Sequence, residues 1–148
     1  MSDYIVKLIG SFFGSIGFGL IFHGKGKNIL IASIGALIGI SGYMFCTDYV
    51  HLSVFISALI AGFICDIYSE IMARILKAPS TAFFLITIIP LIPGSTLYYC
   101  IDKIVAQDRE LALQYGVQTF LTALGICVGM SIAWAICDLI RKMHLKVK

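Results

Sequence analysis

Charged side chains are scarce in this chain. Asp, Glu, Lys and Arg make up only 13% of its 148 residues, whereas a soluble globular domain carries about a quarter. Hydrophobic residues make up 59%, and the mean hydropathy is +0.98. The composition therefore excludes a water-soluble domain and predicts an all-α integral membrane protein, with the lipid bilayer around a single transmembrane domain, residues 1–148. The net charge of +3 gives no sign of a nucleic-acid partner.

Residue groups that carry chemistry are also lacking. The five cysteines form no Cys-x-x-Cys pair, and the three histidines lie apart from them in the sequence. No Ser/His/Asp set and no phosphate-binding loop is visible. We therefore expect no enzyme, no catalytic residue, no metal site and no cofactor. The cysteines are expected to serve as small buried apolar side chains.

Long apolar runs are abundant instead. Five of them reach the length of about 20 residues that a membrane-spanning helix needs: 4–22, 29–46, 53–76, 80–105 and 116–140. Eight of the eleven basic residues lie at or after the ends of the first and third runs or in the C-terminal tail, whereas five of the eight acids lie at the opposite ends. Because basic loops stay in the cytoplasm, we predict a multi-pass protein of the cell membrane with its N-terminus outside and its C-terminus in the cytoplasm.

Proline is rare, and two of the three prolines interrupt the fourth run. Pro90 and Pro93 stand with Gly94 and Ser95 about eleven residues from the start of that run. Each proline lacks an amide donor and pushes the preceding residue out of the helical region. Unpaired backbone at membrane depth is tolerated only where protein or a water-filled cavity covers it. The fourth helix is therefore predicted to be broken at Pro90–Ser95, as in transporters whose half-helix ends point at a substrate.

The break supplies groups that can bind a small solute. Ser95 and Thr96 open the second half-helix and are suited to cap its N-terminus, where free amides favour a carboxylate. The carbonyls freed before Pro90 and Pro93 can hold a cation or an ammonium group. We predict Pro90, Pro93, Gly94, Ser95 and Thr96 as solute-binding residues. The alternative is a proline kink that neighbouring helices repair, without any role in transport.

The third run contains ionisable residues at helical spacing. Asp66, Glu70 and Arg74 follow one another at intervals of four, and Asp66 lies about 16 Å from the cytoplasmic boundary, near the centre of a core about 30 Å thick. A carboxylate at that depth is costly and indicates function. Burial favours its neutral form, which suits proton coupling. The alternative is structural: Glu70 pairs with Arg74, and a neighbouring helix holds Asp66.

Glycines recur at the spacing of close helix packing. Three pairs lie four residues apart: Gly10/Gly14, Gly35/Gly39 and Gly125/Gly129. Small residues let helix backbones approach where lipid offers no hydrophobic drive for association. The pairs predict packing within the chain or, for at least one of them, docking onto another subunit, which can be a second copy or a different protein.

Two segments around the break resemble a known family. The first is Ala73–Thr81, which reads Ala-Arg-Ile-Leu-Lys-Ala-Pro-Ser-Thr, and the second is Ile88–Ser95, which reads Ile-Ile-Pro-Leu-Ile-Pro-Gly-Ser and precedes Tyr98. Their order and spacing are similar to the second membrane domain of the threonine/serine exporter family. Ile34–Leu37 also looks like its counterpart there. The resemblance covers nearly the whole chain.

The resemblance implies a function that the residues alone do not. The family is associated with export of threonine and serine driven by the proton-motive force, and some split members move a dicarboxylate such as succinate. In its length the chain resembles the split form, whose small subunit works with a larger membrane subunit of the same family. The implied function is the small subunit of a two-component exporter of small carboxylate metabolites. The alternative is a subunit that assembles or stabilises a larger partner without transporting anything.

Overall fold

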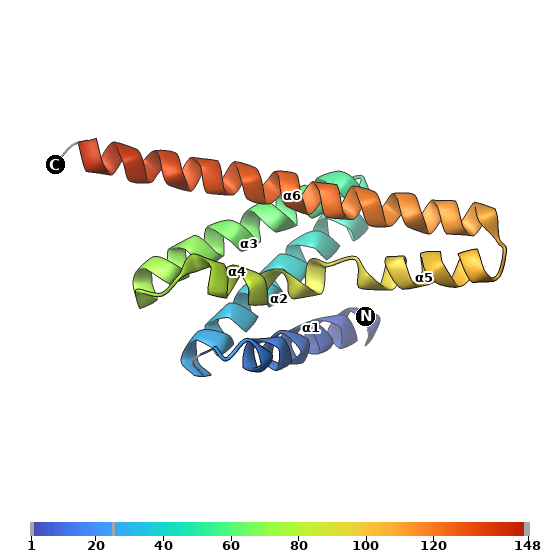
Figure 1. Cartoon of the computed structure of the whole chain (residues 1–148), viewed down its shortest axis with the longest axis horizontal. Coiled ribbons are helices and arrows are strands. Elements are labelled where there is room, and N and C mark those ends of the chain that lie inside the picture. The colour runs from blue at the N-terminus through green and yellow to red at the C-terminus, as the bar shows by residue number, and fades with distance from the viewer. Residues whose placement is uncertain (1, 25, 147–148) are drawn as a thin grey trace.

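The computed structural model describes residues 2–24 and 26–146, and this part is helical throughout (Figure 1). Its elements are α1 (Ser2–Ile21), α2 (Gly26–Asp48), α3 (Val54–Leu76), α4 (Ser80–Ile88), the short 3₁₀ helix η1 (Ile89–Leu91), α5 (Gly94–Val105) and α6 (Arg109–Lys146). Within these residues, four helices are long and apolar enough to cross a membrane, and the bent pair Ser80–Leu91 and Gly94–Val105 makes a fifth when it is counted as one broken span. The prediction of an all-α membrane fold with a broken fourth helix is confirmed.

The ends of α3 follow from local chemistry. The Ser53 hydroxyl accepts a hydrogen bond from the Ile56 amide at 3.4 Å and caps the first turn. Lys77 adopts a left-handed conformation with φ of 51°, which ends the helix before Pro79. The predicted run 53–76 therefore matches this helix closely, because both signals lie in the sequence beside it.

The last helix differs from its prediction. The fifth span was expected at 116–140, but α6 begins at Arg109 and has 38 residues, a length of about 57 Å. The Asp108 carboxylate caps it by accepting the Leu111 amide at 3.2 Å. Helix α5 covers the first turns of α6, and Ala112 of α6 is buried. Packing against α5 therefore extends α6 through residues that precede the predicted run.

Close backbone contact joins α3 to α6. A Cβ atom at Gly125 would lie 2.5 Å from the Phe55 carbonyl oxygen, and one at Gly129 would collide with the carbonyl of Leu59. From the other side, a Cβ atom at Gly62 would lie 2.9 Å from the Ile126 carbonyl oxygen. Glycine is needed at these positions because the obstructing atoms belong to the backbone.

The other two glycine pairs have different surroundings. A Cβ atom at Gly35 would collide with the Tyr68 ring, and one at Gly39 with the Cys65 sulfur, so this pair packs α2 against α3. Gly10 and Gly14 have no atom within 4 Å of the position of a Cβ. Two of the three predicted pairs therefore serve packing inside the chain, and the pair on α1 faces open space.

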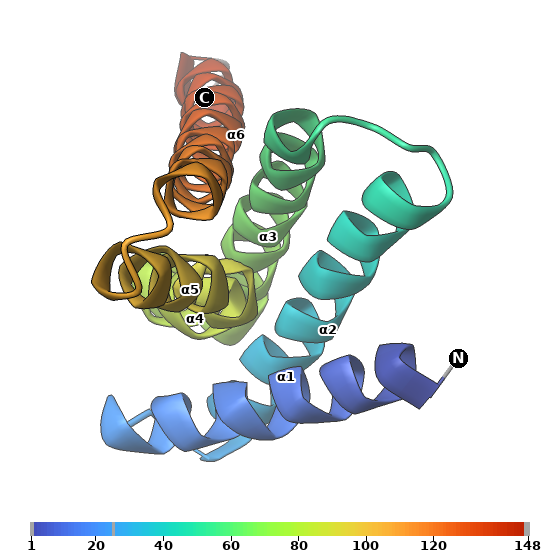
Figure 2. The same cartoon turned by 90° about the vertical axis from the view of Figure 1, so that its right-hand side faces the viewer.

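The broken span occupies the middle of the molecule. In both views α4, η1 and α5 lie between α1 and α6, and α5 runs beside the first half of α6 (Figures 1 and 2). Polar bonds hold α4 in place: the fully buried Thr87 hydroxyl donates to the Phe83 carbonyl at 2.8 Å and lies 3.3 Å from the Ala32 carbonyl on α2. Protein therefore covers α4 and the 3₁₀ turn, where Leu91 is buried, whereas Ile92 in the break is 57% exposed.

Candidate functional site

The helix break combines a 3₁₀ turn with a tight turn. The axis bends by 47° between Ser80–Leu91 and Gly94–Val105. Within the break, the Ile92 amide donates to the Ile89 carbonyl at 3.2 Å, and the Gly94 amide donates to the Ile92 carbonyl at 2.7 Å. Pro93, with φ of −76° and ψ of 53°, is the centre of this second turn, which is an inverse γ-turn. The prolines therefore redirect the chain without unravelling it.

Two details of the predicted site are corrected by this geometry. The carbonyls before Pro90 and Pro93 belong to Ile89 and Ile92, and each already accepts a hydrogen bond, so neither is free as expected. Ser95 does not cap α5 either, because the helix begins at Gly94 with Pro93 in the capping position and no side-chain cap. The reason in both cases is the tight turn, which uses the backbone groups that an open break would leave unpaired.

Thr96 also has a role other than the expected cap. Its hydroxyl donates to the Pro93 carbonyl at 3.1 Å, and the Thr119 hydroxyl lies 2.8 Å from it in a hydrogen bond between α5 and α6. The Leu97 amide donates to the Pro93 carbonyl at 3.1 Å and closes the first turn. The amides of Ser95 and Thr96 precede that bond, in the part of a helix where amides lack an intrahelical acceptor.

A cavity of about 460 Å³ lies against the break, and we call it the break cavity. Helices α1, α2 and α6 and the segment from η1 to the start of α5 form its walls. Four of the five predicted solute-binding residues line it, namely Pro90, Pro93, Ser95 and Thr96, whereas Gly94 does not. Its volume lies in the range of about 300–1,000 Å³ that small-molecule sites occupy.

Several polar residues of the break cavity were missed by the sequence reasoning. They come from α1, α2 and α6: Lys7, Ser11, Tyr43, Gln118 and Thr122. Among the described lining residues, Lys7 alone carries a charge, and this charge is positive. A signal was present in the sequence, because Lys7/Ser11 and Gln118/Thr122 are polar pairs at a spacing of four within apolar helices. The unobstructed Gly10 and Gly14 also line this cavity.

The predicted acidic residues lie in a different place. Asp66 and Glu70 line a second cavity of about 490 Å³ between α3, α4 and α6, which we call the acidic cavity. An apolar cluster that includes Cys65, Ile88 and Leu91 lies between the two cavities, with Leu91 lining the break cavity. The structure therefore does not bring the two sets of predicted residues together.

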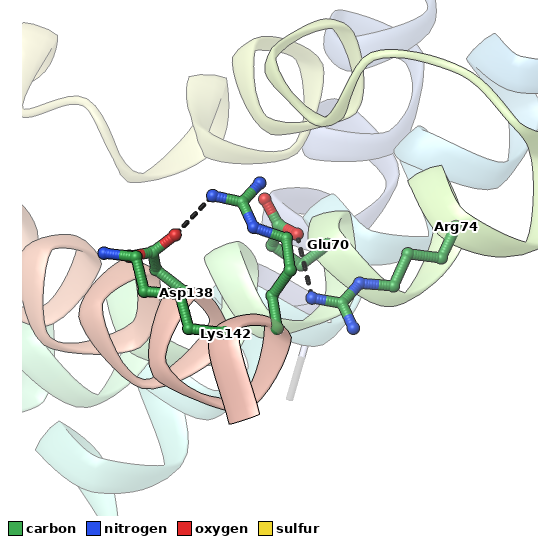
Figure 3. Close-up of polar contacts among 5 residues, drawn as sticks. Glu70, Arg74, Asp138 and Lys142 are labelled. Carbon is green, nitrogen blue, oxygen red and sulfur yellow. Dashed lines mark hydrogen bonds and ion pairs between the residues drawn. The ribbon is translucent and has the colours of Figure 1, made fainter. Parts of the chain in front are cut away.

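The charges at this end of α3 and α6 are largely paired (Figure 3). Arg74 lies 3.6 Å from Glu70, and on α6 the Asp138 carboxylate contacts Arg141 and lies 2.6 Å from Lys142. Asp66 differs, because it is only 8% exposed and its Oδ2 atom has no hydrogen-bond partner among the described residues. No neighbouring helix holds this oxygen, in contrast to the structural alternative.

These features define the class of the protein. A helical membrane protein whose fourth span breaks beside a cavity lined by apolar and polar residues has the architecture of membrane transporters. The family model described as Threonine/Serine exporter, ThrE, matches residues 7–136. The chain therefore belongs to the threonine/serine exporter family, a family of transporters, and is a multi-pass membrane protein. Comparison with curated proteins found no match, and comparison with solved structures found none.

Proposed function

We propose that the chain is the small membrane subunit of a two-component exporter of small carboxylate metabolites, driven by the proton-motive force. The solutes are threonine and serine, or a dicarboxylate such as succinate. The break cavity carries the proposal, because its lining brings Lys7 of α1 together with Ser95 and Thr96 in the first turn of α5. A cation and a helix N-terminus together favour a carboxylate.

The orientation in the cell membrane is part of the proposal. The N-terminus lies outside and the C-terminus in the cytoplasm. Most basic residues lie near the C-terminal ends of α1 and α3 and in the C-terminal tail, which lie on the same side of the membrane in this proposal. The break cavity, with Lys7 near the start of α1, then lies toward the outer side. The acidic cavity, with Ser80 at the start of α4, lies toward the cytoplasm.

A larger membrane subunit of the same family is the proposed partner. Helix α5, all twelve residues of which are described, has no buried residue and packs mainly against α6. Large apolar side chains are therefore exposed along it: Leu97, Tyr98, Tyr99, Ile101, Ile104 and Val105. This surface supports contact with another membrane helix. It equally favours the second candidate function, a subunit that only assembles its partner, but that function leaves the break cavity without a role.

The proposal gives the acidic residues separate roles. Asp66 exchanges the coupling proton, which its buried and unpartnered oxygen supports. Glu70 and Arg74 form an ion pair that stabilises this end of α3. The pair is half exposed on the arginine side, so its contribution to stability is small.

Uptake into inside-out vesicles tests the proposed function. Vesicles containing this chain and the larger subunit are expected to accumulate labelled threonine, serine or succinate, and a protonophore should abolish the accumulation. Vesicles with either chain alone should accumulate none. Pro93→Ala is expected to lower uptake at least about tenfold, because it releases the turn that shapes the cavity wall.

Pro79→Ala is the matched control, since Pro79 precedes α4 and does not line the break cavity. Both variants must reach the membrane in normal amount. Full uptake by Pro93→Ala would contradict a transport role for the break. Absence of uptake for all three solutes, with a stable complex of the two chains, would favour the assembly subunit.

A further inference from the structure

The acidic cavity has walls of distinct chemistry. Helix α3 contributes two carboxylates, the start of α4 two hydroxyls, and α6 a hydroxyl and the single tryptophan of the chain. The lining residues are Asp66, Glu70, Ser80, Thr81, Phe84, Met130, Ser131, Trp134 and Ala135. A volume of about 490 Å³ suits an organic solute, whereas a bare cation needs oxygen ligands within about 2.0–2.6 Å on all sides.

Asp66 gives this cavity an unbalanced negative charge. Its Oδ2 atom is fully buried and has no hydrogen-bond partner among the described residues. The lining residues of α4 and α6 carry no charge, and on α3 the charge of Glu70 is compensated by Arg74 at 3.6 Å. A buried carboxylate needs a positive or hydrogen-bonding partner. An ammonium group supplies both, because it carries a positive charge and three donors.

The wall formed by the start of α4 favours a negative charge, in contrast to the wall that carries Asp66. Helix α4 begins at Ser80 after Pro79, and no side chain caps its first turn. The amides of Ser80 and Thr81 precede the first bonded amide of the turn, that of Ala82, and both residues line the cavity. Such a helix start favours a carboxylate. Trp134 of α6 also lines the cavity, and an indole ring can attract a cation.

We propose that the acidic cavity is a second solute site, which holds a zwitterionic amino acid with its ammonium group on Asp66 and its carboxylate at the start of α4. A dicarboxylate is rejected there, because its second carboxylate meets Asp66 and Glu70, so this proposal narrows the exported solutes to threonine and serine. This proposal rests on the proposed function for the direction of transport, which makes this cavity the cytoplasmic entry. The break cavity then receives the solute after the apolar cluster around Cys65 and Leu91 has parted.

Trp134 provides a direct measurement, because the only tryptophan of the chain lines the cavity. The full-length chain in lipid nanodiscs is titrated with threonine and with succinate while its tryptophan fluorescence is recorded. Threonine is expected to give a saturable change and succinate none. Asp66→Asn is expected to weaken threonine binding at least about tenfold, since the amide carries no charge. Asp138→Asn is the control, because Asp138 is paired with Lys142 and does not line the cavity.

A second variant protects the test against a folding defect. If Asp66→Asn elutes as an aggregate, Thr81→Val replaces it, with several-fold weaker threonine binding expected. An equal response to succinate, no response to threonine, or unchanged binding by a folded Asp66→Asn would overturn the second site. Vesicle uptake separates the two proposals: uptake without a Trp134 response refutes only this site, and a Trp134 response without uptake refutes only the transport function.

Discussion

Gly14→Leu is expected to lower solute uptake at least about tenfold while the protein folds and reaches the membrane normally. Gly14 lines the break cavity, and no atom lies within 4 Å of the position that a Cβ would take. The Cβ of a leucine therefore meets no obstacle, and the rest of the side chain is expected to occupy the cavity. The loss then reports occupation of the solute's space and not damage to the fold.

Gly17→Leu is the matched control for this prediction. Gly17 lies on the same helix and also has no atom within 4 Å of a Cβ, but it does not line the break cavity. Uptake by Gly17→Leu should stay close to that of the wild type in the same vesicles. Equal uptake by Gly14→Leu and the wild type would mean that the solute does not pass through this cavity.

Among the Gly→Ala substitutions in this chain, Gly129→Ala is expected to destabilise the fold most. The added Cβ collides with the Leu59 carbonyl on α3, and a backbone atom cannot move aside as a flexible side chain can. Overpacking of this kind costs about 1–3 kcal/mol, and here it separates α3 from α6. Thermal unfolding of the purified protein in detergent, followed by size-exclusion chromatography, measures the loss.

Gly17→Ala serves as the reference for stability, because its methyl group meets no atom within 4 Å. It should unfold at the temperature of the wild type or slightly above, since alanine favours a helix over glycine. If Gly129→Ala unfolds no earlier than Gly17→Ala, the close packing of α3 against α6 is wrong.

The parts of the fold that were predictable depend on local chemistry. The break at Pro90–Ser95 could be predicted because a proline acts on its own backbone and that of the residue before it. The end of α3 could be predicted for the same reason. The start of α6 could not, because the Asp108 cap and packing against α5 extend that helix through polar residues outside the apolar run.

The composition of the site was only half predictable. Pro90, Pro93, Ser95 and Thr96 lie side by side in the sequence, but Lys7 and Gln118 reach the same cavity from two distant helices. Only tertiary packing brings such residues together, so one sequence cannot reveal their proximity. Asp66 and the break were both expected near the middle of the membrane. For the same reason as above, this similar depth did not mean that they line one cavity.

The central claim is that the break cavity holds a carboxylate solute, and the KM for uptake in Lys7→Gln tests it most directly. Lys7 is the charged residue among the described residues that line this cavity. We expect the KM for the transported solute to rise at least about tenfold in Lys7→Gln. Lys7→Arg should keep a KM near that of the wild type, as should Lys103→Gln on α5, whose side chain does not line the cavity. An unchanged KM in Lys7→Gln would contradict the account.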